Sequence, residues 1–304
     1  MPSIAHISLT FVGLMWVLPF LYYYHSYPLT TFYQEWGAAI LGLSAMPLLV
    51  TKRYWLQPEI PLIVLLPIGL LLLGMMQFVL GRVGYFEQIL LFALYLLWAA
   101  LLMMLGQRLR EEFGLPALAT ALATFLLVGA ELNALAGILQ NYRWHTFLDA
   151  VVTAKISVAV YGNVAQPNHF ANYITLGLIS LGLLHMRSLL RAWYVVLLTM
   201  PLLFVLVLSG SRSVWLYLLF MAGMAWWWQR SDKSCLPLLR YTVLLLLGFG
   251  LMHAVVQIPW LEGASGSVTT MRRLFGEGAS GSIRLYLWRE GWQIFTQFPL
   301  LGAG

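Results

Sequence analysis

The chain has 304 residues, of which 61% are hydrophobic and 9% are charged, and its mean hydropathy is +0.81. A soluble globular domain carries roughly 25% charged residues, so this composition excludes a soluble protein. The net charge of +6 does not require nucleic acid as a partner, because membrane orientation accounts for most of the cations. The single cysteine, Cys235, cannot form a disulfide within the chain. The six histidines show no His-Glu-x-x-His pattern, so the sequence indicates no metal site and no cofactor.

Apolar runs close to the roughly 20 residues that cross a bilayer recur along the chain and predict an all-α polytopic integral membrane protein. We place about nine transmembrane helices at residues 5–24, 36–51, 60–80, 89–106, 116–139, 169–186, 192–208, 213–229 and 241–258. Only residues 209–212 separate the seventh and eighth spans, so a merged or re-entrant pair stays open. The first span lacks the basic start and cleavage site of a signal peptide.

The basic residues predict the orientation, because short cytoplasmic loops collect Lys and Arg. Nine of the 17 lie in loops on one side, four in the other short loops and four after the last span. We therefore expect a cytoplasmic N-terminus, a transmembrane domain over residues 1–258 and the start of a periplasmic loop over residues 259–304. The four arginines of that loop run against the charge bias, which makes them candidates for function.

The entrance to the sixth span is unusually polar. Three amides and one histidine lie within seven residues there, at Gln166, Asn168, His169 and Asn172. Pro167 favours an extended Gln166, and Asn168 is a suitable N-cap. Helix entry and capping alone could explain this composition. Alternatively, the amide donors and the helix dipole would attract an anion.

A second polar patch, Ser209-Gly210-Ser211-Arg212-Ser213, lies between the seventh and eighth spans. An arginine at mid-bilayer costs roughly 2.5–3.5 kcal/mol on insertion scales. Arg212 is thus either an interfacial arginine that snorkels to water or a functional one. In the functional case its guanidinium matches the oxygens of a phosphate with two parallel hydrogen bonds.

A third patch lies in the tail, where the sequence Glu-Gly-Ala-Ser-Gly-Ser at 262–267 recurs at 277–282 as a loop repeat. Arg284 and Arg289 follow it in a stretch that predicts an amphipathic helix near 283–297. Arg284 and Trp288 are four residues apart and so share one face. A helix that lies on the membrane is the alternative to a functional role for these arginines.

The three patches all fall on the predicted outer side. Together they describe a pocket rich in arginine and amide donors in a protein without a nucleotide-binding loop or a metal motif. Such a pocket suits a lipid-linked diphosphate, whose head is anionic and whose tail requires lipid.

The order of three motifs resembles that of the O-antigen ligase and polymerase superfamily. The motifs are Gln166-Pro167-Asn168, the turn 209–213, and an Arg284-x-x-x-Trp288 helix that leads to Pro299-Leu-Leu-Gly-Ala-Gly304. Within it, the chain is most similar to the bacterial protein (pilin) O-oligosaccharyltransferases. The motifs cover residues 160–304, and the pattern of spans extends the resemblance over the whole chain.

The resemblance implies a metal-independent glycosyltransferase of the bacterial inner membrane. It would transfer a glycan from undecaprenyl diphosphate to a hydroxyl of a pilin-like acceptor protein on the periplasmic side. Arg212 and Arg284 would then be catalytic, because they hold the diphosphate as it leaves. Gln166, Asn168, His169, Ser211 and Arg289 would bind the substrate.

The chain departs from the family pattern in one respect. Family members carry a periplasmic loop with a histidine thought to activate the acceptor, followed by further spans, and neither occurs within these 304 residues. We assign that role to none of His145, His169 and His253, and we expect the chain to be part of a longer protein.

Three other functions stay open. An O-antigen polymerase or a lipopolysaccharide ligase would use the same donor with a sugar hydroxyl as the acceptor. A transporter is disfavoured because Glu131, beside Asn133, is the main ionisable group within the spans. A purely structural subunit would leave the outer arginines unexplained.

Overall fold

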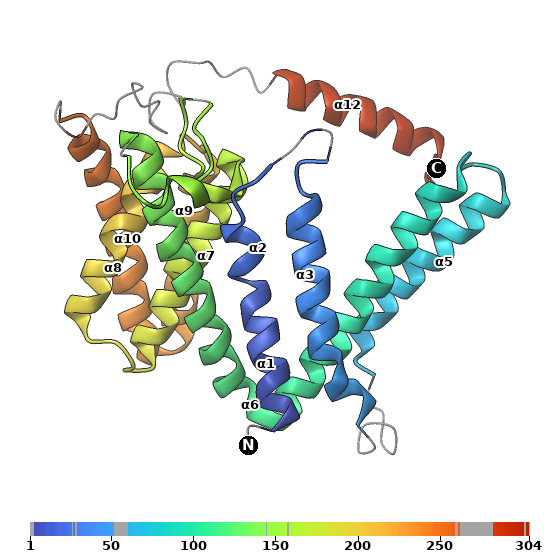
Figure 1. The fold of residues 1–304 in the computed structure, drawn as a ribbon, viewed down its shortest axis with the longest axis horizontal. Coiled ribbons are helices and arrows are strands. Elements are labelled where there is room, and N and C mark those ends of the chain that lie inside the picture. Colours follow the sequence, from blue (N-terminus) through green and yellow to red (C-terminus); the bar gives the residue numbers. More distant parts are fainter. Residues whose placement is uncertain are drawn as a thin grey trace. The chain divides into compact units, whose positions relative to one another are not determined.

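The computed structural model describes residues 3–25, 27, 29–51, 60–143, 145–156, 158–258, 261, 282–300 and 302–303. Within these ranges the chain forms helices and turns without a strand (Figure 1). The predicted all-α fold is therefore confirmed. The chain divides into two compact units. Unit 1 comprises Met1–Phe11, Gly42–Leu118 and Ala279–Gly304, and unit 2 comprises Val12–Leu41 and Ala119–Gly278.

A helix occupies the place of every predicted span. The helices are α1 (Ile4–Met15), α2 (Leu18–Leu21), α3 (Phe32–Ala45), α5 (Leu65–Val79), α6 (Phe86–Tyr142), α7 (Pro167–Met186), α8 (Ala192–Leu208), α9 (Ser213–Ser231), α10 (Leu236–Val256) and α12 (Ser282–Gln297).

Several of these helices have the length and apolarity of membrane spans. In the described part of the chain, four segments meet both criteria: Ile4–Leu21, Leu62–Val79, Phe86–Tyr142 and Lys233–Val256. Ala192–Leu208 is a shorter apolar helix. The chain is thus a multi-pass membrane protein, while the count of nine spans and the orientation stay predictions.

Helix α6 joins two predicted spans, and the loop expected at residues 107–115 is largely helical. Arg108 is buried there and its guanidinium bonds Glu111 at 2.9 Å and Glu112 at 2.5 Å, one turn further along the helix. The helical geometry breaks only at Gly114, whose φ of 74° is accessible to glycine. Pro116 follows, and proline disfavours helical geometry in the chain before it.

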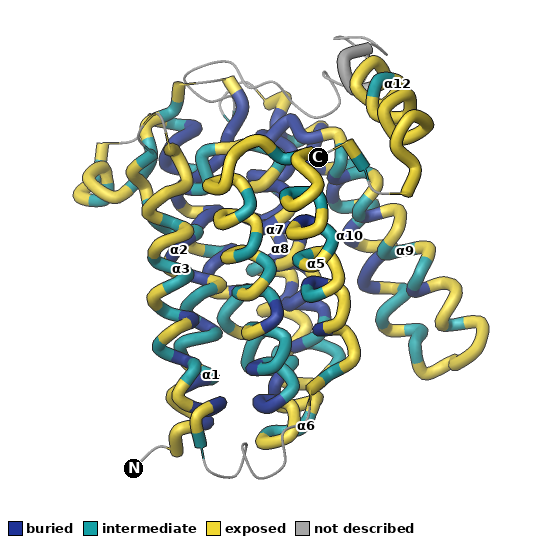
Figure 2. The backbone as a smooth tube through the Cα atoms, turned by 90° about the vertical axis from the view of Figure 1, so that its right-hand side faces the viewer, coloured by how far each residue is buried: buried dark blue, intermediate teal, exposed yellow. Residues whose placement is uncertain are grey.

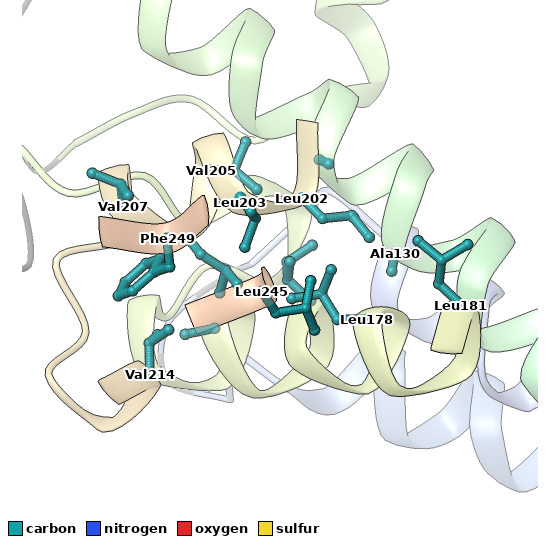
Figure 3. Close-up of a cluster of buried hydrophobic side chains, with 14 of the residues drawn as sticks. Ala130, Leu178, Leu181, Leu202, Leu203, Val205, Val207, Val214, Leu245 and Phe249 are labelled. Carbon is teal, nitrogen blue, oxygen red and sulfur yellow. The ribbon is translucent and has the colours of Figure 1, made fainter. Parts of the chain in front are cut away.

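The core of unit 2 is formed by α7, α8, α9 and α10 with the second half of α6 (Figure 1). Leucine, valine and phenylalanine side chains from these helices meet in the interior (Figure 3). The labelled members of this cluster are Ala130, Leu178, Leu181, Leu202, Leu203, Val205, Val207, Val214, Leu245 and Phe249. Because lipid tails are as apolar as leucine, close van der Waals packing is what holds such helices together in a membrane.

Glycines allow the closest helix contacts in unit 2. A Cβ atom added at Gly177 of α7 would lie 2.3 Å from the Cβ of Ala130 of α6. One added at Gly182 would lie 2.5 Å from the Tyr241 ring of α10. These small residues bring α7 against both α6 and α10, as small residues do between membrane helices.

In unit 1, α5 and the first half of α6 pair as a helical hairpin, with Gly74 facing the Phe92 ring. Many of its large apolar side chains are exposed, among them Leu65, Leu66 and Leu72 (Figure 2). Exposed apolar side chains on apolar helices of spanning length are typical of a lipid-facing surface. The turn after α5 carries Arg82, and α12 belongs to the same unit.

Candidate functional site

The first polar patch forms the start of α7. Gln166 has extended geometry, with φ −139° and ψ 119°, and Pro167 is the first helical residue. The side-chain oxygen of Gln166 accepts a hydrogen bond from the His169 backbone N–H at 2.6 Å. Gln166 is therefore the N-cap, and the prediction that Asn168 caps this helix is wrong. Proline is favoured at the first position of a helix, so the helix begins one residue before Asn168.

The second patch forms the turn between α8 and α9, which are separate helices. The Ser209 hydroxyl donates to the Leu206 carbonyl at 2.7 Å and accepts from the Ser211 N–H at 3.2 Å. Gly210 has a left-handed φ of 62°, which glycine adopts without steric cost. Ser209 and Ser211 are buried, so this turn is held firmly beneath the exposed Arg212.

One hydrogen bond joins the two patches. The Ser211 hydroxyl donates to the Asn168 side-chain oxygen at 2.9 Å, across 43 residues of sequence. This contact supports the prediction that the two segments share a site, and the roles of their residues stay predictions. The bond also explains why Asn168 is not a cap, because its side chain is turned toward α9.

The joined patches present two helix N-termini at one end of unit 2. Helices α7 and α9 begin beside each other there, and Arg212 directly precedes α9. Unpaired amide donors and the dipole give each helix start a partial positive charge. Arg212 has no carboxylate partner among the described residues, and its side chain is exposed, as are those of Gln166 and His169. This arrangement favours an anion with several oxygens.

Two buried amides of unit 2, Asn163 and Gln140, which the sequence analysis gave no role, support this end. Gln140 of α6 donates to the carbonyls of Thr153 at 2.8 Å and Gly162 at 3.3 Å. Its oxygen accepts from the backbone N–H groups of Tyr161 at 3.1 Å and Gly162 at 3.2 Å. Gln140 thereby holds the short helical turn Gly162–Val164, which leads directly into α7.

Asn163 extends the same network toward the N-terminal helices. Its side-chain nitrogen donates to the carbonyls of Leu21 at 2.8 Å and Val151 at 2.7 Å, and its oxygen accepts from Thr153 N–H at 2.9 Å. In α6, Asn133 accepts from the Asn163 backbone N–H at 3.2 Å. The signal in the sequence was the pair Asn133 and Gln140, which are seven residues apart and so lie on one face of an apolar helix.

A further cation lies in the loop between α6 and α7. The Lys155 ammonium donates to the Asn141 side-chain oxygen at 3.3 Å. Burial lowers the pKa of Lys155, and the nearby Arg143 guanidinium lowers that pKa further. A lysine in such surroundings keeps less of its positive charge at high pH than a solvated one.

His253 of α10 is enclosed by aromatic rings. It is 3% exposed, stacks on Trp215 at 5.8 Å between ring centroids and meets Phe249 edge to face at 4.9 Å. Neither of its ring nitrogens has a hydrogen-bond partner in the described structure. An acceptor hydroxyl in solvent cannot reach such a buried ring, so we assign His253 no catalytic role.

The two predicted arginines of the tail belong to unit 1, on α12. The side chain of Arg284 lies outside the described residues, and that of Arg289 is exposed. The proposed roles of both arginines therefore rest on the sequence. The repeats at 262–267 and 277–282 also lie outside the described residues, apart from the backbone of Ser282.

Comparisons with known proteins match the same segments. Residues 193–304 match the model of a family described as O-antigen ligase, and residues 160–185 match one described as protein glycosylation ligase. The chain is 28% identical over 298 residues to the general O-oligosaccharyltransferase of Acinetobacter baylyi, over 96% of this chain and 50% of that protein. The chain thus spans about half the length of this relative. No solved structure matches.

Proposed function

We propose that the joined patches of unit 2 bind the diphosphate of a lipid-linked glycan for transfer to an acceptor hydroxyl, because parts of the chain match the O-antigen ligase and protein glycosylation ligase families. The observation that carries the proposal is the hydrogen bond between Ser211 and Asn168. It places the exposed Arg212 beside the starts of two helices, at one end of a bundle of apolar helices.

The proposed chemistry is the displacement of a diphosphate from a sugar. The acceptor oxygen forms a bond to the anomeric carbon, and the bond from that carbon to the diphosphate oxygen breaks. The electron pair of the broken bond stays on the diphosphate, whose negative charge grows in the transition state. Arg212 and the amides at the start of α7 and α9 would stabilise that charge. The proton of the acceptor passes to a base that we do not assign within this chain.

The proposed donor is undecaprenyl diphosphate that carries a glycan, in the bacterial inner membrane. A donor with a long apolar tail suits a site at the end of membrane helices. The proposed acceptor is a serine or threonine hydroxyl of a protein on the periplasmic side, which the similarity to a general O-oligosaccharyltransferase supports. Gln166, His169 and the α12 residues Arg284 and Arg289 are proposed to contact the donor as well.

The test is the exchange of Arg212 in the protein reconstituted in proteoliposomes with its lipid-linked donor and an acceptor. We expect Arg212→Ala to lower the rate of undecaprenyl diphosphate release by roughly 10²–10³-fold, the usual effect of losing one transition-state donor. Arg212→Lys should restore only part of the rate, since an ammonium lacks the guanidinium fork. An unchanged rate for Arg212→Ala would refute the proposal.

The matched control is Arg191→Ala. Arg191 is also an exposed arginine next to a helix start in unit 2, but it precedes α8, whose far end carries the Ser209–Ser213 turn. Its loss should leave release unchanged. Movement of the intact glycan across the membrane, with no release of undecaprenyl diphosphate, would instead indicate a transporter.

A second candidate function shares the donor and differs in the acceptor. The match of residues 193–304 to the O-antigen ligase family favours a sugar hydroxyl, either on the lipopolysaccharide core or on a growing polymer. Parallel assays with an acceptor protein and with a lipopolysaccharide core separate the two candidates. The acceptor that becomes glycosylated in an Arg212-dependent manner identifies the activity.

A further inference from the structure

Helix α12 presents an uncovered apolar face. Trp288, Trp292 and Phe295 follow each other at spacings of four and three residues, so they lie along one side of the helix. Their exposed fractions range from 52% to 77%, and Figure 2 shows α12 exposed along most of its described length. A Cβ added at Gly291, in the middle of the helix, would meet no atom within 4 Å.

The other side of α12 is polar. Gln293 and Gln297 are four residues apart and form a second stripe along the helix, and Arg289 lies at the border between the two stripes. Helix α12 has 16 residues and contains Arg284, Arg289 and Glu290, which makes it too short and too charged to cross a bilayer. Its two faces instead match those of a helix that lies flat in a membrane surface.

The end of α12 is fastened to the hairpin of α5 and α6. The Arg82 guanidinium, in the turn of that hairpin, donates to the Gly302 carbonyl at 2.7 Å. The same guanidinium lies over the Phe298 ring, 5.6 Å from the ring centroid, a cation–π distance. All these residues belong to unit 1, so the anchor fixes the position of α12 relative to the hairpin.

The anchor sets the depth of α12. Both α5 and α6 contain segments with the length and apolarity of membrane spans, so the turn that joins them lies where the hydrocarbon ends. The chain after α12 is held at that level by Arg82. Figure 1 shows the C-terminal end of α12 beside the turn between α5 and α6, with the rest of α12 pointing away from this hairpin instead of running alongside it.

We propose that α12 is an interfacial helix, with Trp288, Trp292 and Phe295 inserted among the lipids and with Gln293 and Gln297 facing water. Lipid covers the apolar face, since Arg82 holds the helix at the boundary where tryptophan side chains are most favourable. Such a helix buries its apolar face roughly 5–10 Å into the region between headgroups and acyl chains. This inference does not depend on the proposed transfer activity.

The test uses the single cysteine of the chain. In a Cys235→Ser background, a nitroxide label is attached to Trp288→Cys or Phe295→Cys on the apolar face, and to Gln293→Cys or Gln297→Cys as matched controls on the polar face. The full chain is placed in nanodiscs of phosphatidylethanolamine and phosphatidylglycerol. Collisions with oxygen, which concentrates in lipid, are compared with collisions with a water-soluble nickel complex.

We expect collisions with oxygen to dominate at positions 288 and 295 and collisions with the nickel complex to dominate at positions 293 and 297. Access of the nickel complex to all four positions would overturn the proposal, because it would place α12 in water. Exclusion of both reagents from the apolar positions would also overturn it, because it would show that protein covers this face. Adding Arg82→Gln to the Phe295→Cys chain should move the label toward water, and an unchanged depth would overturn the anchoring role of Arg82.

Discussion

Replacement of Gln140 by leucine tests whether the buried amide network holds the entrance to α7. Gln140 is 4% exposed, and its side chain makes two donor and two acceptor contacts with the backbone of Thr153, Tyr161 and Gly162. Leucine has a similar volume but no polar atoms. Gln140→Leu therefore removes the hydrogen bonds without opening a large cavity.

The expected loss follows from the groups left without partners. A buried donor or acceptor without a partner costs about 1–3 kcal/mol, and the N–H groups of Tyr161 and Gly162 both lose the Gln140 oxygen. Their bonds are fairly long, at 3.1 and 3.2 Å, so we take the lower part of that range for each. The expected decrease in the free energy of unfolding is about 2–4 kcal/mol, or roughly 4–16 °C in Tm at about 2–4 °C per kcal/mol.

Thermal unfolding of the purified protein in detergent, followed by tryptophan fluorescence, measures this loss. The matched control is Gln107→Leu, the same exchange in the same helix, where the side chain makes one bond to Glu111 at 3.1 Å near the surface. The control should change the free energy of unfolding by less than about 0.5 kcal/mol. If Gln140→Leu is as stable as Gln107→Leu, the network does not stabilise unit 2 and the reasoning fails.

Three further predictions concern the site and the core. Asn168→Ala and Ser211→Ala should each weaken donor binding. The loss of binding free energy in the double variant should be smaller than the sum of the two single losses by about 0.5–1.5 kcal/mol. Strictly additive losses would show that the hydrogen bond contributes nothing. The amine of Lys155 should react with acetic anhydride with a pH midpoint below that of lysine in a peptide, because burial and Arg143 lower its pKa, and Arg143→Gln should raise the midpoint; no change on that exchange would exclude the charge effect. Gly177→Leu should destabilise the chain by about 1–3 kcal/mol through overpacking against α6, measured by the same thermal unfolding, and an unaltered Tm would mean that α6 and α7 are not in close contact.

The helices could be predicted from the sequence because an apolar run in a membrane has few alternatives to a helix. The segment 107–115 is the exception. Its charged residues indicated a loop, yet Arg108 pairs with Glu111 and Glu112 at helical spacing, and such pairs stabilise a helix. A polar composition alone does not distinguish a loop from a helix whose charges pair along its own surface.

The site was predictable in its parts and not in its contacts. Arg212 and the amides near α7 stood out because polar groups are costly among membrane helices. The bond between Ser211 and Asn168 spans 43 residues, and no local rule relates positions so far apart. Gln140 escaped notice because its spacing from Asn133 indicates a shared helix face but not the backbone groups that the two amides satisfy.

The location of the site follows from the way the helices alternate. Helices α7 and α9 are separated by one helix, α8, so in an alternating bundle they run in the same direction and begin at the same end. Each helix start carries about half a positive charge, and the fixed turn at Ser211 adds the full charge of Arg212. Positive charge therefore gathers at this end of unit 2 before any ligand arrives. If a diphosphate leaves here as we propose, a site built in this way needs little rearrangement to stabilise its charge, which is the property that electrostatic catalysis requires.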